Sequence, residues 1–368
     1  MQRVALNSCQ IGMVVARNIY SANGQLLLGK GSVLTGAYIR RLREMGIMSV
    51  FVESTLFKDI EAPDVISEET RNRAIQSVQA SLNSLRVSGH VNVEQFRAVA
   101  KSIVDEIMGN PQAIVHLTDI RAHDDYTFSH SVSVCVLAVL TAMSLGYSHS
   151  RLADLAVGAL LHDAGKMLVP KEILNKPGRL TDEEFAIMKK HAELGFGVLR
   201  KRHNELSVVA AHVAYQHHEK YGGGGYPRGL KGEEIHEFAR VTAIADVYDA
   251  VTSERPYRKA MLPHEAYEMI MGYSNTYFDA KLLKAFTDNI ALYPVGTMVR
   301  LNTGETGIVV AVPKGMQHRP KVRIVLDPEG RPCSNREIDL TQHLTTFISE
   351  VLCIEDTFKI TNAEGARH

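Results

Sequence analysis

The chain has 368 residues, with 41 lysines and arginines against 41 aspartates and glutamates, so its formal net charge is zero. This length exceeds that of one ordinary folding unit, and we expect two or three. The balanced charge excludes the strongly basic field of proteins that bind nucleic acid without sequence preference, so we expect no nucleic-acid partner.

The sequence contains no run of 18 or more uncharged apolar residues, and its first residues are of mixed polarity. We therefore expect no membrane insertion and a cytoplasmic location. The four cysteines, Cys9, Cys135, Cys333 and Cys353, lie far apart and form no CxxC pair. This spacing argues against a disulfide framework and against a thiolate zinc site, and predicts reduced, mostly buried thiols.

Residues 1–60 show the pattern of a small β-rich module. Asn23-Gly24 separates residues 18–20 from the apolar run 25–28, and this dipeptide favours a tight hairpin because it tolerates positive φ. Between residues 61 and 119 the apolar positions recur every three or four residues, which indicates amphipathic helices. We expect this region to act as a linker or to pack on the next domain or on a second subunit, in a homodimer.

Residues 120–290 are expected to form the main domain, helical almost throughout, with breaks at stretches rich in glycine and proline. One helix start is well marked, because Thr181 can cap the amide of Glu184 while Glu184 reaches back. The helix that follows should place His191 on its inward face, together with apolar residues.

After residue 290 the pattern returns to strands, at residues 307–312 and 322–326, followed by a turn at 327–330. We expect a C-terminal β-rich module over residues 291–355 and a tail over 356–368. The predicted fold class is therefore mainly α, with an all-helical domain between small β-rich modules at the N- and C-termini.

Histidines and aspartates occur at positions of the helical domain that should face its core. They are His130, the pair His162-Asp163, His191, the pair His217-His218, and Asp246. A buried carboxylate without a partner is unfavourable, whereas imidazole nitrogens and carboxylate oxygens together coordinate divalent transition metals. One such histidine alone would more often be a hydrogen-bonded core residue. One four-coordinate ion cannot use seven ligands, so the set predicts two ions bridged by Asp163.

Two neighbouring cations favour phosphoester hydrolysis, because they lower the pKa of bound water and stabilise charge on phosphate oxygens. Lys166 lies three residues after Asp163 and could hold a non-bridging phosphate oxygen or assist the leaving group. Its alternative interpretation is a solvated lysine after a helix end. Asp163 and Lys166 are the predicted catalytic residues.

The run Leu161-His162-Asp163-Ala164-Gly165-Lys166 resembles the HDxGK signature of the HD phosphohydrolase superfamily. The later segments His217-His218-Glu219, Gly225-Tyr226-Pro227 and Asp246 to Arg258 resemble those of the HD-GYP family of cyclic di-GMP phosphodiesterases. This resemblance spans about residues 120–290. It implies an HD-type helical domain that hydrolyses cyclic di-GMP to linear pGpG and then GMP.

The resemblance also implies roles for individual residues. One metal would be held by His130, His162, Asp163 and Asp246, and the other by Asp163, His191, His217 and His218. The family's usual metal is iron or manganese, and an oxygen and nitrogen ligand set agrees with either, while zinc stays an open alternative. A bridging hydroxide would attack phosphorus, with Lys166 on the scissile phosphate and Arg255 and Arg258 on the other phosphate or a guanine. Tyr226 and Pro227 would shape the pocket rim, which in some relatives contacts a GGDEF-domain protein.

Two positions depart from the family pattern. Tyr126 stands where some relatives carry a glutamate that recruits a third metal, so we expect two ions. Residues 222–225 are all glycine. Relatives commonly have an acidic residue before the first of these glycines and a polar residue in place of Gly224. Such a loop is entropically unfavourable to order and lacks one side chain, so turnover could be slow.

Three other functions stay open at this point. The chain could hydrolyse another cyclic dinucleotide or a nucleotide, because a metal cluster fixes the reaction better than the base. It could be a non-catalytic cyclic di-GMP receptor that signals through its terminal modules. It could also be a helical scaffold for redox or metal storage, in which nucleotide binding would not depend on Arg255, Arg258 or Tyr226.

Overall fold

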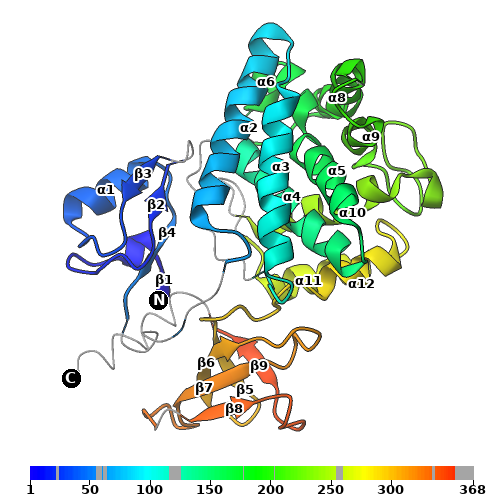
Figure 1. Cartoon of the computed structure of the whole chain (residues 1–368). Coiled ribbons are helices and arrows are strands. Elements are labelled where there is room, and N and C mark those ends of the chain that lie inside the picture. Colours follow the sequence, from blue (N-terminus) through cyan, green and yellow to red (C-terminus); the bar gives the residue numbers. More distant parts are fainter. Residues whose placement is uncertain are drawn as a thin grey trace. The chain divides into compact units, whose positions relative to one another are not determined.

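The computed structural model describes residues 1–21, 25–54, 60, 64–115, 126–176, 178–202, 204–253, 260–333 and 336–352. The chain divides into two compact units, one of residues 1–64, 114–126 and 290–368, the other of residues 65–113 and 127–289. The second unit is helical and carries the predicted metal ligands, and the first contains the β-rich modules (Figure 1). The predicted mainly helical fold class is confirmed.

The helices of the second unit pack side by side and, apart from α7, are labelled in Figure 1. They are α2 (Glu68–Ser88), α3 (Val93–Gly109), α4 (Tyr126–Ser144), α5 (His149–Leu160), α6 (Lys171–Leu174), α7 (Asp182–Lys189), α8 (His191–Leu199), α9 (Val208–Gln216), α10 (Glu237–Thr252), α11 (Pro263–Gly272) and α12 (Ala280–Thr287). Short 3-10 helices lie between them at η4 (Ala164–Leu168), η5 (Arg200–Arg202) and η6 (Gly232–Glu234). Within the described residues, no helix combines the length and the apolar character needed to cross a membrane.

The apolar helix α4 is buried within this unit. On α4, Val134, Leu137 and Leu140 are at most 3% exposed, which is typical of a helix apolar on all sides. The neighbouring α5 packs against α3 and α9, and α8 packs against α9 and η4. Each fully buried leucine or valine contributes about 1.5–3 kcal/mol to stability. The packing of these helices therefore stabilises the positions of the polar residues that lie between them.

The predicted capping box is confirmed at α7. The Thr181 hydroxyl accepts the Glu184 N–H at 3.3 Å, and the Glu184 carboxylate accepts the Thr181 N–H at 2.7 Å.

The prediction of one continuous helix from Thr181 through His191 is wrong, because α7 ends at Lys189 and α8 begins at His191. At this break the His191 ring folds back, and its Nδ1 bonds the Met188 carbonyl at 2.7 Å. His191 is buried, as expected, at 1% exposure.

The N-terminal module contains two short antiparallel strand pairs. Strand β1 (Gln2–Ala5) pairs with β4 (Ser49–Val52), and β2 (Ile19–Tyr20) pairs with β3 (Leu26–Leu28). The latter pair confirms the strands of the predicted hairpin, whereas Asn23-Gly24 lies outside the described residues. The module also contains η1 (Leu6–Ser8) and helix α1 (Gly36–Glu44), which was not predicted; Thr35 caps it by accepting the Tyr38 N–H.

The C-terminal module is a five-stranded antiparallel sheet in the order β8-β7-β6-β5-β9. Its strands are β5 (Met298–Leu301), β6 (Thr306–Ala311), β7 (Lys321–Leu326), β8 (Glu337–Asp339) and β9 (Ile348–Val351). Strands β6 and β7 confirm the two predicted from the sequence. Cys9 and Cys333 are half-buried and Cys135 is fully buried, while Cys353 lies outside the described residues.

Candidate metal centre

The predicted ligands are supplied by separate elements of the helical unit. His130 lies on α4, His162 and Asp163 in the turn between α5 and η4, His191 at the start of α8, His217 and His218 at the end of α9, and Asp246 on α10. The structure brings them together as overlapping groups of three or four residues that could hold a metal ion. His130, His162, Asp163, His191 and His217 are each at most 2% exposed.

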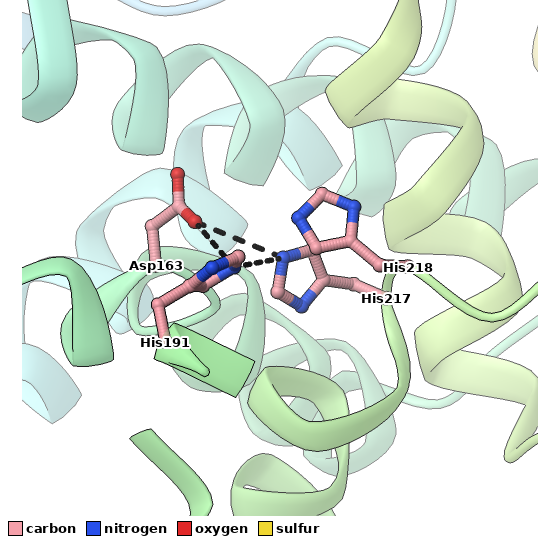
Figure 2. Close-up of side chains that lie close together, drawn as sticks. All are labelled: Asp163, His191, His217 and His218. Atoms are coloured by element: carbon pink, nitrogen blue, oxygen red, sulfur yellow. Dashed lines mark hydrogen bonds and ion pairs between the residues drawn. The ribbon is translucent and has the colours of Figure 1, made fainter. Parts of the chain in front are cut away.

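Asp163 belongs to two of the three groups, and the third consists of His162, His217 and Asp246. Its Oδ1 lies 3.5 Å from Nε2 of His191 and 3.7 Å from Nε2 of His217, and Figure 2 shows these side chains turned toward one another. Its Oδ2 lies 3.2 Å from Nε2 of His162 and 3.9 Å from Nε2 of His130. The two carboxylate oxygens thus face two different pairs of histidines.

The ring orientation of four histidines is fixed by their other nitrogen. Nδ1 lies 2.7 Å from the Ala159 carbonyl in His162 and 2.7 Å from the Met188 carbonyl in His191. In His217 it lies 3.1 Å from the Ala214 carbonyl, and in His130 it lies 2.7 Å from the Asp249 carboxylate. Because Nδ1 donates to these carbonyls in His162, His191 and His217, Nε2 of these three rings carries a lone pair that points to the centre of the cluster, whereas Nε2 of His130 lies 3.0 Å from Asp246 Oδ1.

The cluster fits a divalent transition metal. Such ions bind nitrogen and oxygen at about 2.0–2.2 Å, so two ligands of one ion lie roughly 3–4 Å apart. The 3.0 Å between His130 Nε2 and Asp246 Oδ1 lies in this range, as do the Asp163 distances. Among the described residues, the buried His162 Nε2 and Asp163 Oδ1 have no hydrogen-bond partner. A bound cation would satisfy both.

The protonation states also suit metal binding. Burial lowers the pKa of His191 to about 4 and holds the pKa of His218 well below its ordinary value. Burial would raise the pKa of Asp163, but the positive charge of Lys166 and the contact with His162 outweigh it and keep that pKa well below its usual range. At neutral pH Asp163 is therefore ionised while His191 and His218 are neutral, as ligands must be.

Lys166, the predicted phosphate contact, lies on η4 directly beside the cluster. Its Nζ is 2.5 Å from Asp163 Oδ2, and its side chain is 26% exposed. The ammonium group thus reaches both the carboxylate and the surface of the site. This position is different from that of a solvated lysine.

Gly165 allows η4 to approach α8. A Cβ at this position would lie 1.9 Å from the His191 carbonyl oxygen and 2.6 Å from the Gly195 nitrogen. The glycine of the HDxGK segment therefore lets Asp163 and His191 lie next to each other.

We expect Gly165→Ala to lower the free energy of unfolding by about 3 kcal/mol, because the added methyl group overlaps a backbone that cannot move aside. Thermal unfolding would measure this loss. Gly197→Ala on α8 is the matched control, since a Cβ there meets no atom within 4 Å. Equal stability of the two variants would contradict the packing account.

The loop after His218 is organised by Glu219, a residue that was not singled out from the sequence beyond its place in the motif. Its carboxylate, 4% exposed, accepts the N–H groups of Arg228 at 2.7 Å and Leu230 at 2.9 Å. Gly225 lies so close that a Cβ would be 2.5 Å from Glu219 Cα. Glu219 thus ties the segment after the glycine run back to the residues that precede the run.

The four-glycine run is also held from outside. The Tyr221 N–H donates to the Tyr277 carbonyl at 3.0 Å, and the Gly222 N–H donates to the Thr276 carbonyl at 2.7 Å. The loop backbone is therefore fixed although the run lacks side chains. Its effect on turnover stays a prediction.

Tyr226 lies beside the cluster. The centre of its ring is 4.7 Å from that of His218, its N–H donates to the His218 carbonyl at 3.2 Å, and burial raises the pKa of its hydroxyl. Pro227 follows it in the same loop, half-buried. Arg255, Arg258 and the side chain of Tyr126 lie outside the described residues, so their roles stay predictions.

Asp249 is the residue of this site that the sequence analysis missed. Its Oδ2 lies 2.7 Å from His130 Nδ1, and the carboxylate is buried. Burial disfavours a charged His130, but hydrogen bonds to Asp246 and Asp249 outweigh it and raise the pKa of that histidine to about 9. Its spacing of three residues from Asp246 on α10, which places both carboxylates on one helix face, was the signal that could have identified it.

Asp249→Ala is expected to weaken metal retention by about 10- to 100-fold, because a carboxylate behind a ligating histidine fixes the ring and raises its basicity. Asp249→Asn, which keeps an acceptor oxygen, should lose less. Metal retained after titration with a chelator measures both. Asp154→Ala, at an exposed position of α5, is the control, and an Asp249→Ala variant equal to it would refute the positioning role.

Comparisons with known proteins agree with this geometry. Residues 116–282 match a family model described as an HD domain, and residues 298–360 match one described as a KOW domain associated with the HD domain. The chain is 30% identical over 370 residues to a cyclic di-GMP phosphodiesterase of Pseudomonas aeruginosa, covering 92% of this chain and 89% of the relative.

Two further matches are partial in coverage or in identity. The chain is 35% identical over 170 residues to a 3'3'-cGAMP-specific phosphodiesterase of Vibrio cholerae, covering 46% of this chain and 33% of that protein. A solved structure from Bdellovibrio bacteriovorus, described as a HDG"Y"P protein, is similar with a TM-score of 0.52 and 21% identity, over 78% of this chain and 98% of the other. The latter likeness shows the fold alone.

Proposed function

This chain belongs to the HD-GYP family of HD-domain proteins, and from its His/Asp cluster we propose that it is a metal-dependent phosphodiesterase that hydrolyses cyclic di-GMP. The observation that carries the proposal is the orientation of the four histidines, whose Nε2 atoms converge on the two oxygens of Asp163. A purely structural histidine core would not need free lone pairs on one side of a buried carboxylate.

The proposal assigns His130, His162, Asp163 and Asp246 to one ion and Asp163, His191, His217 and His218 to the other, with iron or manganese as the metal. Bound there, the ions would supply Lewis acidity and activate water for phosphoester hydrolysis. The residues of the chain have their own tasks. Lys166 orients and neutralises a non-bridging phosphate oxygen, and Tyr226 and Pro227 limit access of the substrate to the cluster.

Cyclic di-GMP is preferred here as substrate because the relative aligned over nearly the whole chain is a phosphodiesterase for that molecule. A second candidate is 3'3'-cGAMP, since the relative specific for it matches 170 residues of this chain at 35% identity, a higher identity over less of the chain. Both molecules present the same phosphodiester to the metal cluster, so the difference between them must lie in base recognition. The products pGpG and GMP belong to the proposal, as do the contacts of Arg255 and Arg258.

The domain boundaries, the cytoplasmic location, the homodimer and the GGDEF-domain partner stay predictions from the sequence. Each needs its own measurement. For the homodimer, the most direct measurement is the molecular mass in solution.

The substrate is tested by comparing initial rates on cyclic di-GMP, 3'3'-cGAMP and cyclic di-AMP with one metal-loaded preparation. We expect cyclic di-GMP to give the highest kcat/KM, with pGpG as the first product resolved by chromatography. A higher kcat/KM for 3'3'-cGAMP would assign the chain to the second candidate. Tight binding of cyclic di-GMP with no turnover of any of the three would identify a receptor.

A further inference from the structure

The end of α7 places a cation and an aromatic ring beside Tyr226. Nζ of Lys189 lies 5.1 Å from the centre of the Phe185 ring and 5.9 Å from the centre of the Tyr226 ring. The Tyr226 ring in turn lies 4.7 Å from that of His218. The rings of His218, Tyr226 and Phe185 therefore extend outward from the metal centre, with the Lys189 ammonium group between the last two. Phe185 is 46% exposed.

The local fold fixes this arrangement relative to the cluster. Phe185 and Lys189 are one helical turn apart on α7, so their side chains share a face. The helix ends at Lys189, two residues before His191, and the break between α7 and α8 sets where both point. Of the three acids on this helix, Glu184 is bound by Lys176 at 2.6 Å and by the N-cap, and the Lys189 ammonium lies over the rings of Phe185 and Tyr226.

We infer that Phe185 and Lys189 recognise a guanine base of the cyclic dinucleotide, an inference that rests on the proposed function. Phe185, which is 46% exposed, offers an aromatic ring for stacking, which tolerates any base because every base has a π-face. Lys189 offers N–H donors for the adjacent O6 and N7 acceptors of guanine. Adenine carries an amino donor where guanine has O6, so the ammonium group discriminates against it. The pair thus determines specificity for guanine.

The test is a comparison of Lys189→Met with Lys190→Met, which removes the same charge one residue later from an exposed side chain. For each variant, kcat/KM is measured on cyclic di-GMP and on cyclic di-AMP, and bound metal is quantified on the same samples. We expect Lys189→Met to reduce the preference for cyclic di-GMP by roughly tenfold at unchanged metal content. Lys190→Met should keep the wild-type preference, and Phe185→Ala should weaken use of both substrates.

A Lys189→Met variant with the wild-type ratio of the two substrates would overturn the inference. So would an equal loss on both substrates, which would make Lys189 a general phosphate contact. If the wild-type protein hydrolyses neither molecule, the proposed function fails, and the inference is then decided by the ratio of the two dissociation constants measured by calorimetry. A ratio reduced about tenfold in Lys189→Met would support guanine recognition, and an unchanged ratio, or no binding, would reject it.

Discussion

Asp163→Ala should remove both metal retention and hydrolysis, with a loss of activity of at least about 10³-fold. Asp163 is 1% exposed, and its two oxygens face separate pairs of histidines at 3.2–3.9 Å. Without it, the cluster loses the one carboxylate that faces both pairs of histidines, so neither group of ligands would hold its cation. Metal content per chain and initial rate are measured on the same sample.

The control for this variant is Asp154→Ala, which removes a carboxylate from an exposed position of α5 in the same helical unit. It should keep wild-type metal content and rate. Circular dichroism establishes that both variants are folded. Equal metal content in Asp163→Ala and wild type would exclude the bridging role of this residue.

Lys166→Met should lower kcat by about 10²–10³-fold while metal content is preserved, because it removes a charge that would act on the phosphate in the transition state. The Nζ atom lies 2.5 Å from Asp163 Oδ2, so its removal makes the ligand group more negative and should not weaken cation binding. Kinetics on cyclic di-GMP at saturating metal separate the two effects. Lys171→Met, at an exposed position at the start of α6, is the control.

A Lys166→Met variant with wild-type kcat would show that this lysine only balances the charge of Asp163. Loss of metal together with activity would show that it supports the ligand arrangement. Either result would remove Lys166 from the catalytic residues proposed here.

Much of the helical unit was predictable because its sequence signals are local. A side-chain hydroxyl or carboxylate that caps the first turn fixes where a helix starts, as at Thr181, and this effect does not depend on contacts with distant segments. The ligand set was predictable for a different reason. Polar side chains such as Asp246 occur in apolar helices only where another group satisfies them, so their positions in the sequence already indicate a site.

What the sequence could not predict depends on contacts between distant segments. The helix breaks at Lys190, where the His191 ring folds back onto the Met188 carbonyl, and no periodic pattern contains such a break. The contact of Gly165 with α8 requires two backbones to meet across the unit. Helix α1 was missed because it is a short helix within a region whose other elements are strands.

The pairing of Asp249 with His130 spans 119 residues, so the sequence could give only the face of α10 on which Asp249 lies. The same holds for Lys189, whose position over the Tyr226 ring depends on both the end of α7 and the loop after α9. Local signals thus predicted which residues are buried and polar, and the fold decided which of them meet.

The central claim is that the His/Asp cluster binds metal ions and that this binding is required for hydrolysis. The most direct measurement is cyclic di-GMP hydrolysis by protein purified without oxygen, with bound metal quantified before and after removal by a chelator and after reloading with iron or manganese. We predict about two ions per chain, conversion to pGpG or GMP, loss of activity with the metal and recovery on reloading. Hydrolysis at an unchanged rate by the metal-free protein would contradict the account.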